Sequence, residues 1–265
     1  MKKIIIFLVF SSNILFAQLN FFNLYKPYQS SICSLPNIYG LQLQMNYIVV
    51  DINTAEFQIP VDLYWGIYDN LEVGVQIIGI SRSTSDVIDK GLGDILIGAK
   101  YNFLEEDKER LSTTPTISTE LGISLPTGDY KKMLGSGGLG GILMWLFEKQ
   151  IVMRSGYYFN FIFNLGFKYN TKNPDNYRVG ESFFYTFGSY FGVNENLDFS
   201  FGVKGNNKFC DEKDKVKILD TESYKSYIYC GLTYNIDIYR KFFGSILFGI
   251  TEDSENLIFN IGMMY

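Results

Sequence analysis

Histidine is absent from the 265-residue sequence, and cysteine is scarce. Without imidazole, the sequence lacks the usual general base of serine and cysteine hydrolases and the commonest metal ligand. Cys33, Cys210 and Cys230 share no metal-ligand spacing, and their odd number leaves at least one thiol unpaired. We therefore expect no enzyme, no cofactor and no metal site, and free thiols with a Cys33–Cys210 disulfide as the alternative.

Positive charge and long apolar runs are also in short supply. The formal net charge is −5, so the basic surface that nucleic acids require is missing and no nucleic-acid partner is expected. Beyond residue 17 no run of about eighteen apolar residues could form a membrane-spanning helix. The sequence has instead 20 tyrosines, 23 phenylalanines and 25 glycines, a composition typical of strands with one apolar and one polar face.

The first seventeen residues are expected to be a cleaved secretory signal peptide. Lys2 and Lys3 precede the short apolar run 4–10, and Ala17 supplies a small residue at the expected cleavage point. An N-terminal anchor helix is the alternative. Residues 18–37 alternate poorly and are expected to form a periplasmic or plug segment, which leaves residues 38–265 for the main domain.

Twelve segments in residues 38–265 alternate apolar and polar residues with the period of a β-strand. In one of them Leu41, Leu43 and Met45 alternate with Gln42 and Gln44. Lipid offers no hydrogen bonds to an open sheet edge, so such strands must close. We predict an all-β fold: an antiparallel up-and-down transmembrane β-barrel of about twelve strands in the outer membrane of a Gram-negative bacterium.

The polar rows of these strands would face the barrel interior. The candidates for lining the lumen are Gln42, Gln44, Gln58, Asp62, Glu72, Gln76, Asp94, Lys100, Glu120, Asn160, Asn164, Lys168, Lys204 and Asn260. Three segments alternate less cleanly, namely 139–147, 182–191 and 242–250. Pro60 lies inside a predicted strand, where a bulge or distortion is expected because proline cannot donate a ladder hydrogen bond.

The outer rows would contact lipid and end in aromatic girdles. The girdle candidates are Tyr47, Trp65, Tyr101, Phe103, Trp145, Phe147, Tyr169 and Tyr234. Tyr265 ends an apolar-faced strand, which resembles the signal read by the barrel-insertion machinery. The connection 205–222 carries Lys208, Asp211, Glu212, Lys213, Asp214, Lys215 and Lys217. Such a charge run predicts a solvated extracellular loop, with specific partner binding as the alternative.

Three short motifs occur in a fixed order. The segment 91–103 reads GLGDILIGAKYNF, residues 125–129 read LPTGD, and residues 134–138 read LGSGG. This trio resembles the outer-membrane family named for the MetA pathway of phenol degradation. The resemblance implies a barrel that takes up small, often aromatic or hydrophobic compounds. From the residues alone, the glycines and Pro126 favour an architectural role, and direct contact of Asp94 or Lys100 with a solute is the alternative.

The sequence therefore favours passive transport of small solutes. Twelve strands lie between eight-strand barrels filled by side chains and sixteen-strand open porins, so a narrow channel is expected. The alternative is a structural or surface-adhesion barrel whose interior groups satisfy one another in a plugged lumen.

Overall fold

The computed structural model describes residues 39–50, 54–83, 88–106, 114–152, 158–194, 196–236 and 240–265. The predicted signal peptide, the segment 18–37 and Cys33 lie outside the described residues.

Twelve long strands form one sheet. They are β1 (Tyr39–Val49), β2 (Ala55–Tyr68), β3 (Leu71–Ser83), β5 (Ile95–Leu104), β6 (Thr116–Leu125), β7 (Gly140–Val152), β8 (Tyr158–Asn170), β10 (Ser182–Asn194), β11 (Leu197–Lys208), β14 (Ser223–Asn235), β15 (Lys241–Gly249) and β16 (Leu257–Met264). The short β4 (Ile88–Leu92) continues the line of β5 along β3. A separate small sheet contains β9 (Tyr177–Arg178), β12 (Glu212–Lys213) and β13 (Val216–Lys217).

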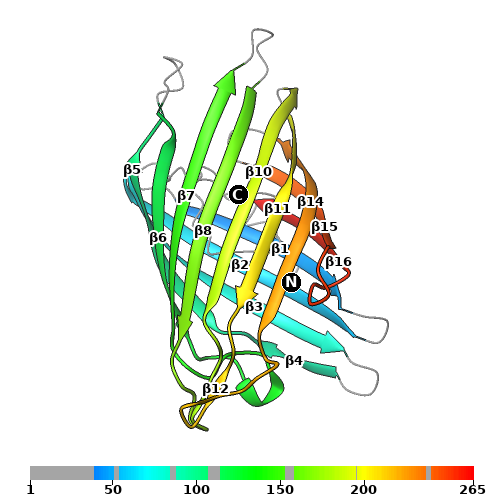
Figure 1. Ribbon diagram of the computed structural model, residues 1–265. Helices are drawn as coiled ribbons and strands as arrows, with labels where there is room; N and C mark the ends of the chain where they lie inside the picture. Colours follow the sequence, from blue (N-terminus) through cyan, green and yellow to red (C-terminus); the bar gives the residue numbers. More distant parts are fainter. Residues whose placement is uncertain are drawn as a thin grey trace, which may run out of the picture.

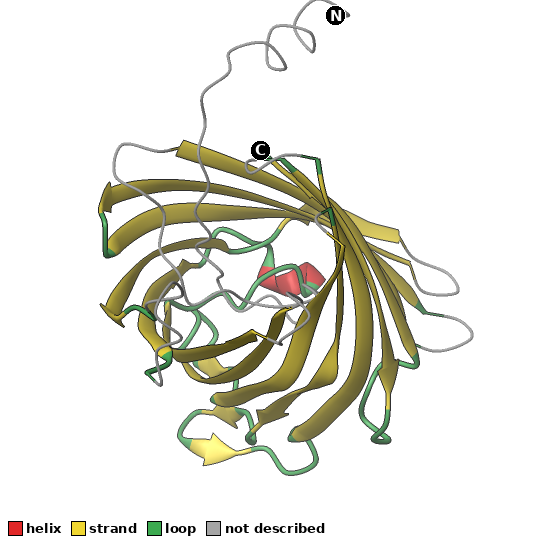
Figure 2. Ribbon diagram, turned by 90° about the horizontal axis from the view of Figure 1, so that it is seen from above, coloured by secondary structure: helices red, strands yellow, loops and turns green. Residues whose placement is uncertain are grey.

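The sheet closes on itself. Each long strand pairs antiparallel with its neighbours along the chain, β2 pairs with both β1 and β3, and β1 pairs with the last strand, β16. Leu41 and Tyr265 exchange two backbone hydrogen bonds of 3.0 and 2.9 Å across that seam. The predicted antiparallel twelve-strand barrel is confirmed (Figures 1 and 2).

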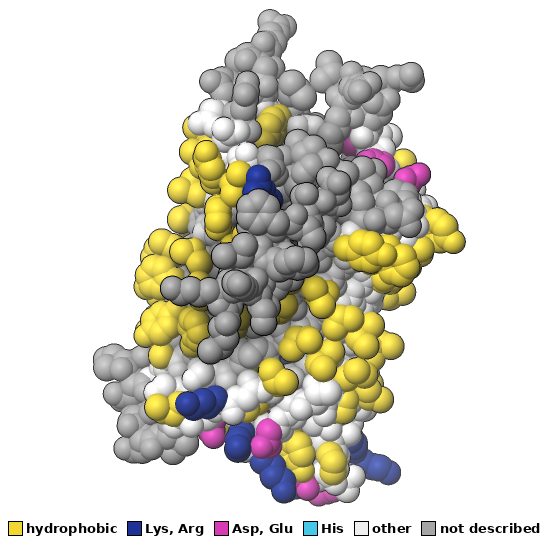
Figure 3. All heavy atoms as spheres, turned by 180° about the vertical axis from the view of Figure 1, so that it is seen from behind, with side chains coloured by type: hydrophobic (Ala, Val, Ile, Leu, Met, Phe, Trp, Pro, Cys, Tyr) yellow, Lys and Arg dark blue, Asp and Glu magenta, His cyan; other side chains and the backbone are white. Residues whose placement is uncertain are grey.

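The two faces of the wall differ as the alternation predicts. On β6, Leu121 and Ile123 are more than half exposed, whereas Glu120 and Ser124 are fully buried. A space-filling view shows hydrophobic side chains over much of the wall, and many of the visible charged side chains at the end that carries β12 (Figure 3). Leu121 and its equivalents therefore form the surface that would contact lipid.

The predicted girdle aromatics lie on the outer face. Seven of the eight are exposed, and Phe147 is partly buried. Several stack across strands: the rings of Tyr39 and Trp65 are 5.5 Å apart, and those of Phe103 and Trp145 are 6.1 Å apart. Such ring pairs add stability beyond the area that they bury.

Pro60 interrupts one ladder without shifting it. Between β1 and β2 the pairing runs in one register on both sides of a gap opposite Pro60, and between β2 and β3 it is continuous there. The expected distortion is therefore a local break in the β1–β2 ladder. The β2–β3 bulge lies near the turn, between Gly66 and Tyr68.

None of the helices in the described ranges is long and apolar enough to span a membrane.

Placing a charge on the outer face should separate lipid contact from solvent contact. Leu121→Arg, at the middle of β6, is expected to lower the free energy of unfolding from lipid vesicles by about 2–4 kcal/mol. Met133→Arg, at a more exposed position in a loop, should change it by less than about 0.5 kcal/mol. Equal effects of the two variants would show that the face of Leu121 does not contact lipid.

Candidate functional site

The predicted lumen residues point into the barrel. Thirteen of them lie on strands at positions that alternate with outward side chains, and Asp94 lies in the break between β4 and β5. Eleven are buried: Gln42, Gln44, Asp62, Glu72, Gln76, Lys100, Glu120, Asn160, Asn164, Lys204 and Asn260. Gln58, Asp94 and Lys168 are partly exposed. Contact of these residues with a solute stays a prediction.

A row of amides follows β1 and crosses to β2. Gln42 donates to Gln44 at 3.2 Å, Gln44 donates to Asn46 at 2.6 Å, and Asn46 donates to Gln58 at 3.4 Å. Each amide both donates and accepts, so each one orients the next. The structure thus brings three of the predicted residues into one hydrogen-bonded line on one wall.

A second group joins three neighbouring strands. The register places Lys100 of β5 opposite both Glu72 of β3 and Glu120 of β6. The Lys100 ammonium lies 3.7 Å from a Glu72 carboxylate oxygen, and both side chains are fully buried. Removing one partner of such a pair usually costs about 3–5 kcal/mol, because the other charge is left buried and uncompensated. Lys100 therefore pairs across strands, with Glu72.

The inner face also carries apolar patches, which corrects the expectation of a purely polar interior. Ile142, Met144 and Leu146 of β7 form one buried cluster. A second, on the wall made by β1, β14, β15 and β16, consists of Ile48, Tyr227, Tyr229, Leu247 and Ile258. The signal was present in the sequence: 139–147 and 242–250 are two of the three segments that alternate poorly, because both of their faces carry apolar residues.

Inward aromatic side chains lie on glycines of nearby strands. A methyl group added to any of these glycines would collide with the aromatic side chain; the pairs are Tyr64 on Gly40, Tyr158 on Gly192, Tyr229 on Gly202 and, two strands away, on Gly188, and Phe243 on Gly262. The Lys204 ammonium lies 4.8 Å from the centre of the Tyr229 ring, within the range of a cation–π interaction. Each ring thus packs closely against the adjoining backbone.

The three sequence motifs meet at one end of the barrel. Asp94, from the first motif, accepts hydrogen bonds from the Gly128 N–H at 3.0 Å and from the Ser136 N–H and hydroxyl at 2.7 and 2.8 Å. Thr127 donates to the Gly93 carbonyl and accepts from the Ile95 N–H. The motifs therefore form one joint that anchors the β6–β7 connection to the break between β4 and β5.

The anchored connection folds across the end of the barrel. Its 3-10 helix, Tyr130–Lys132, lies within the outline of the strands when the barrel is viewed along its length (Figure 2). Asp129 caps this helix by accepting from the Lys131 N–H. Gly135 packs so closely on Asp94 that a Cβ there would lie 2.2 Å from a carboxylate oxygen, which explains the glycine in the third motif.

The predicted loop 205–222 is more ordered than its charge run suggests. Strand β11 extends to Lys208, and β12 and β13 form a hairpin that pairs with β9. Arg178 of β9 bridges Glu181 and Glu212, the latter at 2.9 Å. Lys213, Asp214, Lys215 and Lys217 are exposed, as a solvated loop requires, and local ion pairs and the hairpin add order that the charge run did not indicate.

Asp211 is the buried centre of this loop sheet. It accepts from the Gly180 N–H at 2.7 Å, from the Tyr177 hydroxyl and from Lys208. Although burial acts in the opposite direction, these hydrogen bonds hold the pKa of the Asp211 carboxyl below its usual value. Burial and the hydrogen bond to Asp211 raise the pKa of Tyr177 to about 12. At neutral pH the Asp211 carboxyl is therefore ionised and the Tyr177 hydroxyl is protonated, which are the forms that make this hydrogen bond.

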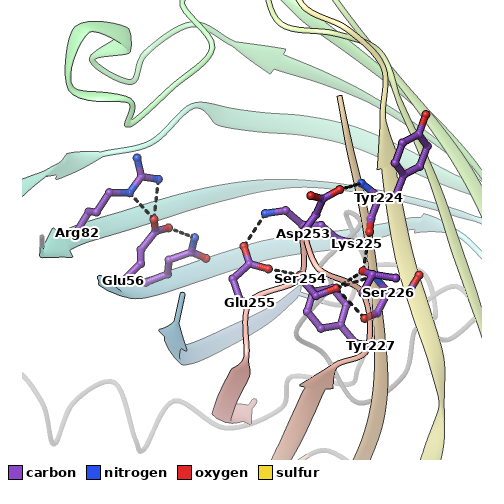
Figure 4. A network of polar contacts seen from close by, with 11 residues as sticks. Glu56, Arg82, Tyr224, Lys225, Ser226, Tyr227, Asp253, Ser254 and Glu255 are labelled. Atoms are coloured by element: carbon purple, nitrogen blue, oxygen red, sulfur yellow. Dashed lines mark hydrogen bonds and ion pairs between the residues drawn. The ribbon is translucent and has the colours of Figure 1, made fainter. Parts of the chain in front are cut away.

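The β15–β16 connection is tied to the adjacent strand β14 (Figure 4). Glu255 pairs with Lys225 at 2.7 Å and accepts from the Tyr227 hydroxyl, and the Ser226 N–H donates to the Ser254 hydroxyl at 2.9 Å. Burial would raise the pKa of the Glu255 carboxyl, but Lys225 and Tyr227 lower it below its usual value.

Figure 4 also shows a second ion pair, between β2 and β3. Arg82 binds Glu56 with two nitrogens, at 2.6 and 2.7 Å, and Gln58 donates to the same carboxylate at 2.5 Å. Arg82 and Glu56 were absent from the predicted set of lumen residues.

No group of His, Cys, Asp or Glu side chains within the described ranges is arranged to hold a metal ion. Cys210 and Cys230 are free thiols, and Cys210 donates to Glu222 at 3.1 Å. Cys33, which the alternative disulfide would need, is not among the described residues.

Comparisons with known proteins agree with this architecture. A family model described as "Putative MetA-pathway of phenol degradation" matches residues 50–265. No curated protein sequence matches the chain.

Solved structures share the fold at low sequence identity. The COG4313 outer membrane channel from Pseudomonas putida F1 is 10% identical, with a TM-score of 0.73 over 89% of this chain and 98% of that one. The NanC porin is 10% identical, with a TM-score of 0.55 over 85% of this chain and 98% of that one. The β domain of the Bordetella autotransporter BrkA is 10% identical, with a TM-score of 0.50 over 86% of this chain and 97% of that one.

The role of Asp94 as an anchor can be tested by proteolysis. Asp94→Asn should weaken the joint by about 2 kcal/mol, because an amide offers one acceptor oxygen and no charge to the three donors. We expect trypsin to cut after Lys131 or Lys132 about 30-fold faster, in proportion to the population of the open loop.

Asp220→Asn is the matched control, since Asp220 is an exposed turn residue elsewhere in the loops. Equal cleavage rates in the two variants would show that Asp94 does not anchor the connection.

Proposed function

The chain belongs to the MetA-pathway-of-phenol-degradation family, and from that membership we propose that it is a passive channel for small solutes in the outer membrane of a Gram-negative bacterium. The observation that carries the proposal is the chemistry of the inner face. The described barrel wall turns amides, charges and compact apolar patches inward, a lining that offers contacts to many solutes.

The packing of the interior supports a through-path. A twelve-strand barrel is wide enough that its side chains need not fill it. The four inward aromatic residues that lie on glycines keep their bulk close to the backbone. This arrangement lets a barrel of modest width carry large side chains on its inner face while leaving space near its axis.

The lining favours neutral or weakly charged solutes with an apolar part. Both charge signs occur, and Lys100 and Arg82 each lie beside a carboxylate. The clusters around Met144 and Tyr229 offer apolar surface to a ring or an alkyl chain. We infer that small hydrophobic or aromatic compounds with a polar group are the preferred class.

The ends of the chain have separate proposed roles. Residues 1–17 would direct export and be removed, and residues 18–37 would remain in the periplasm or enter the lumen as a plug. The last strand, ending at Tyr265, would be recognised by the barrel-insertion machinery. Deletion of Tyr265 tests the last role through the yield of assembled barrel.

A surface-adhesion barrel with a plugged lumen is the second candidate. One observation favours it: the ordered loop sheet presents the apolar side chains of Val216 and Leu219, which are 68% and 74% exposed. Loss of cell-surface binding on deletion of the β12–β13 hairpin, with solute flux unchanged, would support this role.

Conductance of the purified protein in planar bilayers tests the channel. Gly98 lies on the inner face, in register with Gly74 and Gly122, so Gly98→Phe should narrow the lumen and roughly halve the single-channel conductance. Ile97→Phe adds the same ring to the outer face of the same strand and should leave conductance unchanged. Absence of conductance and of liposome swelling with any small solute would reject the channel.

A further inference from the structure

A groove of about 530 Å³ crosses the outer face of the barrel at the seam where the first and last strands meet. Its lining residues come chiefly from β14, β15, β16 and β1, with one each from β2 and β11. Ten of the thirteen occupy outward positions of the alternating strands, and three, Gly231, Ser245 and Asn260, occupy inward ones. The groove therefore opens toward the surface that would contact lipid, and not toward the lumen.

A glycine in a row of large outward side chains creates the groove. The neighbours of Gly244 across the sheet are Leu232 on β14 and Ile261 on β16, and Met45 on β1 lies next to Ile261. A Cβ added to Gly244 would lie 3.5 Å from the Asn260 carbonyl oxygen and 3.7 Å from the Ile261 side chain, which is ordinary contact. The inward glycines lie under aromatic side chains, whereas no ring atom of the described chain comes within 4 Å of that Cβ. The space outside Gly244 is therefore open.

Apolar side chains line most of the groove. Phe199 lines one side and belongs to a group of outward rings, with its centre 5.4 Å from that of Phe191 and 6.0 Å from that of Phe201. Among the ten outward lining residues, only Tyr47 and Cys230 carry a polar group in the side chain. Lipid tails are as apolar as this wall, so attraction between them comes from close van der Waals packing. A recess that surrounds a hydrocarbon chain on several sides therefore holds it more firmly than a convex wall does.

The size of the groove and a nearby charge favour a lipid as its occupant. A stable interface with a second copy of the chain takes about 20–30 residues on each side, more than the thirteen that line the groove. An acyl chain is slender, and the rest of the outer face already meets such chains. Arg240, exposed in the short β14–β15 connection, lies four positions before Gly244, at most about 13 Å away along the strand. Its guanidinium suits the phosphate of a lipid headgroup.

We propose that this groove binds one acyl chain of a phospholipid whose headgroup lies at the β14–β15 connection. The chain passes over Gly244 and Cys230, between Phe199 on one side and Met45 on the other. Because the groove spans the pairing of β1 with β16, the bound chain adds contacts across the seam that closes the barrel. The proposal requires only that the outer face contacts lipid, so it stands or falls independently of solute passage through the lumen.

Binding at this groove can be measured by NMR on the folded barrel in detergent micelles, with the methionine methyl groups labelled with carbon-13. Met45 lines the groove, whereas Met133 lies in a loop. Titration with phosphatidylglycerol should shift the Met45 methyl signal to saturation and leave the Met133 signal in place. A Met45 signal that does not respond, or that shifts linearly without saturating, would overturn the proposal.

Two matched variants assign the binding. Gly244→Phe should fill the groove and weaken phosphatidylglycerol binding about tenfold, and Gly244→Leu serves as a smaller filler if circular dichroism shows that the first variant does not fold. Ile228→Phe adds the same ring at an outward position of β14 that does not line the groove, and should bind as the wild type does. Equal affinities of the filled and control variants would refute the site. Wild-type dimers in native mass spectrometry that Gly244→Phe abolishes would assign the groove to a second copy and refute it too.

Discussion

Every backbone N–H and C=O in the wall needs a partner, because the hydrocarbon interior of a membrane supplies none. An open twelve-strand sheet would leave two unpaired edges there. The seam between β1 and β16, with its paired bonds between Leu41 and Tyr265, removes both edges. Closure then fixes the rest: one face of each strand must suit lipid, and the other must suit whatever fills the interior.

The interior meets this constraint in two ways. Polar side chains bond to one another, as in the row from Gln42 to Gln58 and in the pair of Lys100 with Glu72. Large aromatic side chains find a place on cross-strand glycines, where Tyr64 lies on Gly40. Glycine weakens a strand, but the ring above it restores contact. The glycine-rich, tyrosine-rich composition is therefore a property of the wall as well as of its turns.

Alternation alone predicted the class of fold, the number of long strands and the face on which most polar residues lie, because the period of two follows directly from strand geometry. It did not predict the apolar patches around Met144 and Leu247, since an apolar residue gives no sign of its face when its neighbours are apolar too. It also missed the inward charges of Arg82 and Glu56. Strand ends are set by partners across the sheet, and a single sequence does not show those partners.

The role of Asp94 in the three motifs could be assigned only from the three-dimensional structure. In the sequence Asp94 looks like a lumen carboxylate beside Lys100. In the fold its oxygens accept hydrogen bonds from Gly128 and Ser136. The glycines of all three motifs let the backbone segments of this joint approach one another. The same joint holds the β6–β7 connection against the break between β4 and β5. Asp94 therefore serves the architecture of this end of the barrel, and Lys100 pairs with Glu72 of the neighbouring strand instead.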